Sequence, residues 1–224
     1  MVFALPFLVL VGFALPLLSW ASYRRSLSVD PAPEAGLSLR AMTIQILVLQ
    51  AVVLSLALLA SFGADLALAG RSAFTVTTCL TAIMVIAGAA FVAWLEARKP
   101  LGPRDSLRRK LRQASASDPI WIAVTLVAGG VEEYAYRGVL TSILSGFLGF
   151  GAATVVSAGL FGLAHFAAGW RSAVFGVGFA LAMQALVMLS GGLLLAVITH
   201  VVYDMIATWL GHRLANRLPE RASA

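Results

Sequence analysis

The feature of this sequence that most constrains its fold is a series of apolar stretches long enough to cross a membrane. A hydrocarbon core about 30 Å thick is spanned by roughly 20 helical residues. The chain of 224 residues contains seven such stretches. They cover residues 2–20, 42–62, 74–95, 119–145, 150–168, 173–189 and 191–210. The sequence therefore predicts an all-α, polytopic integral membrane protein with about seven transmembrane helices.

The composition excludes the other common classes of protein. Hydrophobic residues make up 60% of the chain and charged residues only 12%, whereas soluble domains carry about 25% charged residues. The same balance excludes a disordered chain, which needs low hydrophobicity. Cys79 is the single cysteine and has no partner within the chain, so a disulfide scaffold is excluded as well. The expected surroundings are the lipids of a bilayer.

The positions of the basic residues predict an orientation in that bilayer. The chain has 16 Lys and Arg residues and a formal net charge of +6. With seven helices, fourteen of these residues fall on one side of the membrane, in the first, third and fifth connections and the C-terminal tail. Arg71 lies on the other side, and Arg137 lies within a stretch. Because cytoplasmic loops carry the positive excess, we expect an external N-terminus and a cytoplasmic C-terminus, and no nucleic-acid partner.

The last four stretches are joined by short connections rich in glycine. Since glycine permits tight turns, these helices should form a compact antiparallel array. The glycines that we expect to mark the turns are Gly146, Gly149, Gly151, Gly169, Gly191 and Gly192. The chain then divides into a scaffold of three helices with a basic cytoplasmic loop (1–118), a core of four helices (119–212) and a basic tail (213–224).

Ionisable residues inside the stretches are the candidates for function, because a charge in the membrane costs from about 2.5 to more than 10 kcal/mol. They occur only in the four-helix core. The candidate functional residues therefore lie in a different part of the sequence from the three scaffold helices. The fourth stretch has Glu132, Glu133 and Arg137, the fifth has His165, and the seventh has His200 and Asp204.

The two glutamates of the fourth stretch should have different roles. Glu133 and Arg137 are four residues apart on one helical face, where an ion pair would lower the cost of burying both. Glu132 is turned about 100° away from Glu133 and cannot share that arginine equally. Glu132 is therefore a candidate general base.

The histidines have both structural and chemical interpretations. His200 and Asp204 are four residues apart, and a carboxylate beside an imidazole either fixes the tautomer of a catalytic histidine or completes a metal site. His165 is either an interhelical hydrogen-bond donor or a catalytic group. At about 1.5 Å per residue, His165 and Asp204 reach a similar depth in the cytoplasmic half. Glu132 reaches the same layer if the surplus length of its helix lies on that side.

Three short motifs contain these residues. They are Glu-Glu-x-x-x-Arg (Glu132, Glu133, Arg137), Phe-x-x-x-His (Phe161, His165) and His-x-x-x-Asp (His200, Asp204). In this order, on successive helices, they resemble the type II CAAX prenyl endopeptidases, the CPBP or Abi intramembrane proteases that include bacteriocin-processing and immunity proteins. The resemblance covers roughly 119–210, and it suggests the plasma membrane of a bacterium as the location.

The resemblance implies hydrolysis of a peptide bond in a membrane-associated protein or peptide, which in the namesakes of the family is a prenylated CAAX protein. Glu132 and His165 would activate a water, and His200 and Asp204 would stabilise the oxyanion. Glu133, Arg137 and Phe161 would have structural or orienting roles. Some relatives are described as metalloproteases, and His165, His200 and Glu132 are ligand types that suit zinc. The same residues serve equally well without a metal, and their spacing does not decide between the two mechanisms.

Two other functions stay open. Buried Glu, His and Asp also mark ion pathways, so the protein could be an ion-coupled transporter or proton relay, although no inverted repeat or broken helix supports this. It could also be a non-catalytic immunity or adaptor protein that keeps the fold and sequesters a membrane peptide. Other protease classes fit worse, because the chain lacks a His-Glu-x-x-His motif and Ser190 falls at an outer turn.

Overall fold

The computed structural model describes residues 2–28, 38–63, 72–99 and 119–215. These residues are almost entirely helical, and no strand occurs among them. The all-α prediction is confirmed. Most of the expected basic loop, Arg71 and the end of the basic tail lie outside the described residues.

Each of the seven predicted stretches corresponds to a helix or a run of helical segments. The first is α1 (Ala4–Val9), η1 (Leu10–Ala14) and α2 (Leu15–Ser28), and the second and third are α3 (Leu39–Gly63) and α4 (Val76–Ala97). The fourth is α6 (Pro119–Glu132), η2 (Glu133–Leu140) and α7 (Thr141–Leu148), and the fifth is α8 (Phe150–Ala164) with the short η3 (Phe166–Ala168). The sixth and seventh are α9 (Trp170–Ser190) and α10 (Leu194–Ala215).

Five of these helices are long and apolar enough to cross a membrane. They cover Ala4–Leu27, Leu39–Gly63, Val76–Ala97, Trp170–Ser190 and Leu194–Leu214. The other two runs are not among the five: α8 has 15 residues, and the fourth run carries the charged residues Glu132, Glu133 and Arg137 along its length. The protein is a polytopic membrane protein built from helices.

Glycine terminates three of the helices. Gly149, Gly169 and Gly191 have positive φ angles of 76°, 100° and 73°, a conformation that glycine adopts without the steric cost of a Cβ atom. Gly192 lies in the same turn as Gly191. Two predicted turn markers are wrong, because Gly146 and Gly151 lie inside α7 and α8. One residue with positive φ is enough to end a helix. Gly149 has this role between α7 and α8, so Gly146 and Gly151 keep helical geometry.

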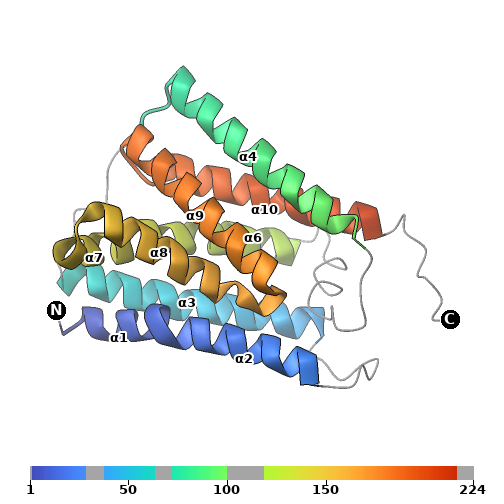
Figure 1. Ribbon diagram of the computed structural model, residues 1–224, viewed down its shortest axis with the longest axis horizontal. Helices are drawn as coiled ribbons and strands as arrows, with labels where there is room; N and C mark the ends of the chain where they lie inside the picture. Colours follow the sequence, from blue (N-terminus) through green and yellow to red (C-terminus); the bar gives the residue numbers. More distant parts are fainter. Residues whose placement is uncertain (1, 29–37, 64–71, 100–118, 216–224) are drawn as a thin grey trace.

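The helices form a layered bundle in which α10 lies between α4 and α6 (Figure 1). On the other side of α6 lies α3, and α8 packs against both α9 and α2. The end of α2, the start of α3, the end of α4, the start of α6 and the end of α10 all lie at one end of the molecule (Figure 1). The helices of the first half therefore flank those of the second half.

Two glycines permit the close contacts that position the core helices. A Cβ atom on Gly129 of α6 would lie 2.8 Å from Val201 Cγ2 of α10, and one on Gly162 of α8 would lie 2.5 Å from the Ala173 carbonyl oxygen of α9. Small residues allow helix backbones to approach closely in membranes. These contacts fix α8 against α9, and they fix α6 against α10, the two helices that carry Glu132, His200 and Asp204.

Candidate active site

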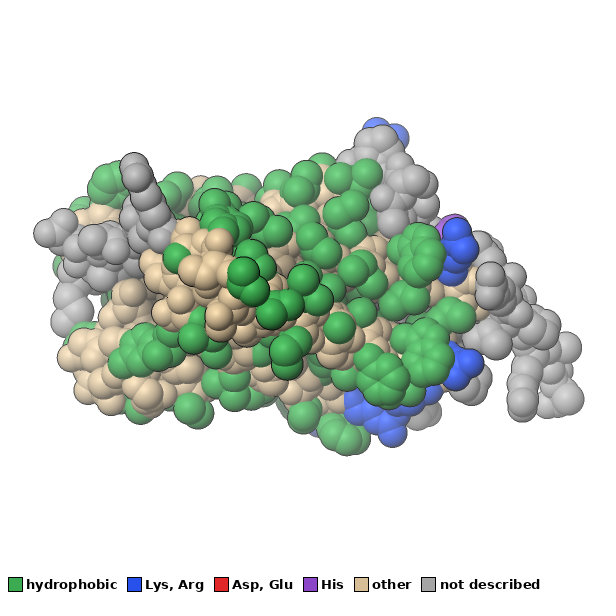
Figure 2. All heavy atoms as spheres, turned by 90° about the horizontal axis from the view of Figure 1, so that it is seen from above, with side chains coloured by type: hydrophobic (Ala, Val, Ile, Leu, Met, Phe, Trp, Pro, Cys, Tyr) green, Lys and Arg blue, Asp and Glu red, His purple; other side chains and the backbone are tan. Residues whose placement is uncertain are grey.

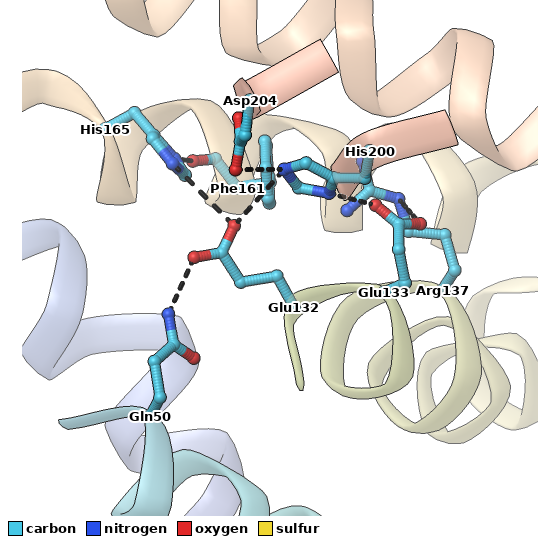
Figure 3. A network of polar contacts seen from close by, with 8 residues as sticks. All are labelled: Gln50, Glu132, Glu133, Arg137, Phe161, His165, His200 and Asp204. Atoms are coloured by element: carbon cyan, nitrogen blue, oxygen red, sulfur yellow. Dashed lines mark hydrogen bonds and ion pairs between the residues drawn. The ribbon is translucent and has the colours of Figure 1, made fainter. Parts of the chain in front are cut away.

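The adjacent glutamates lie where α6 passes into the π-helical segment η2. Consecutive side chains on a helix diverge by roughly 80–100°, so Glu132 and Glu133 point in different directions. Glu132 keeps 16% of its side chain exposed and faces His165 and His200, whereas Glu133 is fully buried. The divergence expected from the sequence is present (Figure 3).

Hydroxyl groups stabilise the π-helical segment. A π-helical turn replaces the usual i to i−4 hydrogen bonds, so some carbonyl oxygens change partners. The Tyr136 carbonyl oxygen accepts hydrogen bonds from Thr141 Oγ1 at 2.8 Å and from Ser157 Oγ of α8 at 3.0 Å. Contact with α8 thus holds η2 in the geometry that separates the two glutamates.

Glu133 forms the buried ion pair that the spacing predicted. Arg137 Nε lies 3.3 Å from Glu133 Oε2, and the two side chains are 2% and 0% exposed. The Arg137 guanidinium group lies over the ring of Phe161, 4.4 Å from its centroid. The Phe161 ring also contacts the His165 ring, with centroids 4.5 Å apart. Phe161 therefore connects the ion pair to a histidine of the site.

His200 is held from both sides by the adjacent glutamates. Its Nδ1 lies 2.7 Å from Glu133 Oε1, and its Nε2 lies 3.9 Å from Glu132 Oε2. Because a carboxylate only accepts, Nδ1 is the protonated nitrogen, and Nε2 can donate only in the imidazolium form. Asp204 Oδ2 is 3.7 Å from Nε2. The sequence pairs His200 with Asp204, but the short hydrogen bond is to Glu133, a contact between helices that spacing within one helix does not reveal.

His165 lies at the end of α8, where the helix turns into η3. Its Nδ1 is 2.8 Å from the Phe161 carbonyl oxygen, which leaves Nε2 directed toward Glu132 Oε2 at 3.9 Å. The turn after His165 is held by α2, because Ser19 Oγ accepts a hydrogen bond of 2.7 Å from the Ala167 N–H. The side chain of His165 is 41% exposed, so this histidine lies on the open side of the site.

Glu132, His165, His200 and Asp204 thus converge from α6, the end of α8 and α10 (Figure 3). Glu132 lies 3.9 Å from each histidine and His200 lies 3.7 Å from Asp204, distances too long for direct hydrogen bonds. A cavity of about 340 Å³ lies between α4, α6 and α10, and Asp204 lines it together with small apolar residues such as Ala128 and Ala207.

The structure adds one residue that the sequence interpretation missed. Gln50 of α3 donates a hydrogen bond of 2.8 Å from Nε2 to Glu132 Oε1. The sequence candidates were ionisable residues within apolar stretches, and Gln50 is uncharged, so it was not among them. The available signal was a glutamine within the apolar stretch 42–62, since a buried amide needs a hydrogen-bond partner.

The residues that suit zinc by type are too far apart to bind it as they stand. Within the described ranges, no three His, Cys, Asp or Glu side chains form a group that could hold a metal ion. Zinc bonds of about 2.0–2.1 Å in a tetrahedron place ligand atoms about 3.3 Å apart, whereas Glu132 Oε2 is 3.9 Å from the Nε2 atoms of His165 and His200. In this arrangement the side chains therefore do not form a zinc site.

Part of the chain matches a known protein family. Residues 115–206 match the family model described as Type II CAAX prenyl endopeptidase Rce1-like. The matched segment contains all three motifs and leaves out the first three helices. No curated protein and no solved structure matches the chain significantly.

Proposed function

We propose that this chain, whose residues 115–206 match the Rce1-like type II CAAX prenyl endopeptidase family model, is an intramembrane endopeptidase. The family match supports a protease function at the level of the family. The observation that carries the proposal is the position of Glu132 Oε2, which faces the Nε2 atoms of two histidines at 3.9 Å each. A carboxylate and two imidazoles around one small space are the groups that peptide hydrolysis by water requires.

Glu132 acts as the general base in this mechanism. A water beside Glu132 Oε2 and His165 Nε2 attacks the peptide carbonyl carbon, and its proton passes to the carboxylate. A new C–O bond forms, and the carbonyl π electrons move onto the oxygen. General base catalysis of this kind contributes about 10² to 10⁴ in rate. The exposed edge of His165 gives the water and the peptide access to this position.

His200 stabilises the oxyanion that forms. Since Nδ1 is committed to Glu133, an imidazolium at His200 presents its Nε2–H toward the space shared by Glu132 and Asp204. A donor fixed in a site that excludes bulk water is most effective where charge develops. The C–N bond then breaks, and Glu132 returns its proton to the leaving amine. The products are a carboxylic acid and an amine, and Asp204 keeps the imidazole oriented.

The surroundings of the site support a membrane-bound substrate. The cavity beside Asp204 is lined mainly by apolar side chains and lies between α6 and two helices, α4 and α10, that are long and apolar enough to cross a membrane. Such a cavity accommodates an apolar segment or a lipid-modified peptide more readily than a hydrated, charged one. A prenylated CAAX peptide is one member of this substrate class.

The test is cleavage of membrane peptides by the purified protein in lipid nanodiscs. The panel contains the same peptides with and without a prenyl group, and mass spectrometry identifies the products. We expect at least one peptide to be cut at one bond, with no cleavage by Glu132→Gln of unchanged thermal stability. Activity should persist with a zinc chelator present. Ion flux in proteoliposomes that requires Glu132, with no peptide cut by the wild type, would instead show a transporter.

A further inference from the structure

We propose that Gln50 is a positioning residue for Glu132, held on α3 outside the segment that matches the protease family. Gln50 fixes one carboxylate oxygen so that the other faces the histidines. This inference rests on the proposed function and extends the machinery of the site to the first half of the chain.

The two oxygens of Glu132 have separate partners. Oε1 accepts the hydrogen bond from Gln50 Nε2 at 2.8 Å, and Oε2 lies 3.9 Å from the Nε2 atoms of His165 and His200. Figure 3 shows Gln50 approaching the carboxylate from the side opposite the histidines. Rotation about the terminal torsion of a glutamate is soft, so a donor at one oxygen restricts where the other oxygen points.

Chemistry fixes which end of the amide faces Glu132. An ionised carboxylate only accepts hydrogen bonds, so the NH₂ group of Gln50 must be the end in contact with it. The amide oxygen of Gln50 then points the other way. It is buried and has no hydrogen-bond partner among the described residues.

The half-satisfied amide argues against a purely structural role. A buried carbonyl oxygen without a partner lowers stability, and an apolar side chain of similar length avoids that cost. Gln50 is only 7% exposed, in a helix that is otherwise strongly apolar. Gln50 therefore carries a burial cost that an apolar residue avoids, and the hydrogen bond to Glu132 Oε1 is what it gains in return.

The variants for testing this are Gln50→Met and Gln50→Leu, which keep the volume of the side chain but remove the donor. Thr43→Val is the matched control: Thr43 is buried on α3, seven residues before Gln50, and its hydroxyl donates to the Leu39 carbonyl oxygen of its own helix. Thermal unfolding, cleavage kinetics and infrared difference spectra are recorded for each. Subtracting the spectrum of Glu132→Gln identifies the carboxyl band of Glu132.

We expect both Gln50 variants to stay folded and to show a shifted Glu132 band, because the loss of one hydrogen bond to a partly exposed carboxylate is a small part of the stability of the bundle. Their kcat should fall by about tenfold or more, as expected for lost geometry at a reacting group, with KM changed by less than about twofold. Thr43→Val should match the wild type in every measurement. An unshifted band would overturn the inference, as would a fall in kcat that Thr43→Val reproduces.

The infrared measurement separates this inference from the proposed function. If the wild type cuts no peptide, the proposed function fails, and the band of Glu132 still decides whether Gln50 holds its carboxylate. If the wild type cuts peptides and the Gln50 variants cut equally fast, the positioning role fails while the protease function stands. Loss of folding in both Gln50 variants would contradict the inference, because it would show a structural role.

Discussion

At the scale of residues, the main feature is the division of work between two adjacent glutamates. Glu133 binds His200 Nδ1 and Arg137 and is sealed from solvent, whereas Glu132 stays partly exposed and faces the space between the histidines. One carboxylate therefore holds an imidazole in a defined tautomer, and its neighbour is free to exchange a proton. The helical offset between consecutive residues makes both roles possible at adjacent positions.

Removing the partner of the buried glutamate should destabilise the protein. In Arg137→Met the side chain keeps its apolar contact with Phe161, but Glu133 loses the cation beside Oε2. Breaking a buried ion pair by removing one partner costs about 3–5 kcal/mol. We expect this loss in the free energy of unfolding in mixed micelles. A variant as stable as the wild type would show that the pair contributes little.

His165 should be essential for cleavage and dispensable for folding. Its imidazole faces Glu132 and is 41% exposed, so its removal leaves no cavity in the core. His165→Asn should lower kcat by about 10²-fold or more, in the range of lost acid–base assistance. The control is His212→Asn, the same change in the last turn of α10, which should leave kcat unchanged. Equal activity of the two variants would remove His165 from the mechanism.

At the scale of elements, the site depends on how closely the helices approach one another. Hydrophobic stretches predicted the helices to within a few residues at most ends, but α2 continues to Ser28, beyond the predicted end at 20, because a helix can extend past its apolar part. The apolar stretches did not predict the π-helical geometry of η2, since they give the length of a helix and not its hydrogen-bond pattern. Spacing placed Glu133 beside Arg137, but contacts between helices, such as Gln50 with Glu132, need the tertiary structure.

A glycine in α8 should be required for the approach of α9. In Gly162→Ala the new Cβ atom would lie 2.5 Å from the Ala173 carbonyl oxygen, a backbone atom that cannot rotate away. Overpacking of this kind costs about 1–3 kcal/mol, and we expect that loss in the free energy of unfolding. Gly159→Ala on the same helix has no atom within 4 Å of the new Cβ atom. It should be as stable as the wild type or slightly more so, and equal stability of both variants would contradict the packing argument.

At the scale of the whole molecule, tryptophan and arginine pairs mark one end of the bundle. Arginines lie over the rings of Trp20, Trp94, Trp170 and Trp209, between 4.0 and 5.6 Å from the ring centroids. The visible Lys and Arg side chains gather toward one end, while hydrophobic side chains cover much of the flank (Figure 2). Tryptophan favours the membrane interface, and basic residues favour the cytoplasmic side. We infer that this end is the cytoplasmic one.

Labelling of single cysteines should test this orientation. In a Cys79→Ala background, Ser38→Cys lies at the start of α3, at the basic end, and Ala73→Cys lies before α4, at the opposite end. Both positions are exposed. An impermeant thiol reagent added to intact cells should label Ala73→Cys and spare Ser38→Cys until the cells are opened. The reverse pattern would invert the topology and move the site to the external half.

The central claim is that Glu132 activates the water that cuts a peptide within the membrane. The most direct measurement is the single-turnover cleavage rate of Glu132→Gln beside the wild type, in nanodiscs, on a peptide that the wild type cuts. The amide keeps the shape of the side chain but cannot accept the proton. We predict a rate lower by about 10² to 10⁴ with unchanged peptide binding. Cleavage at the wild-type rate by this variant would contradict the account.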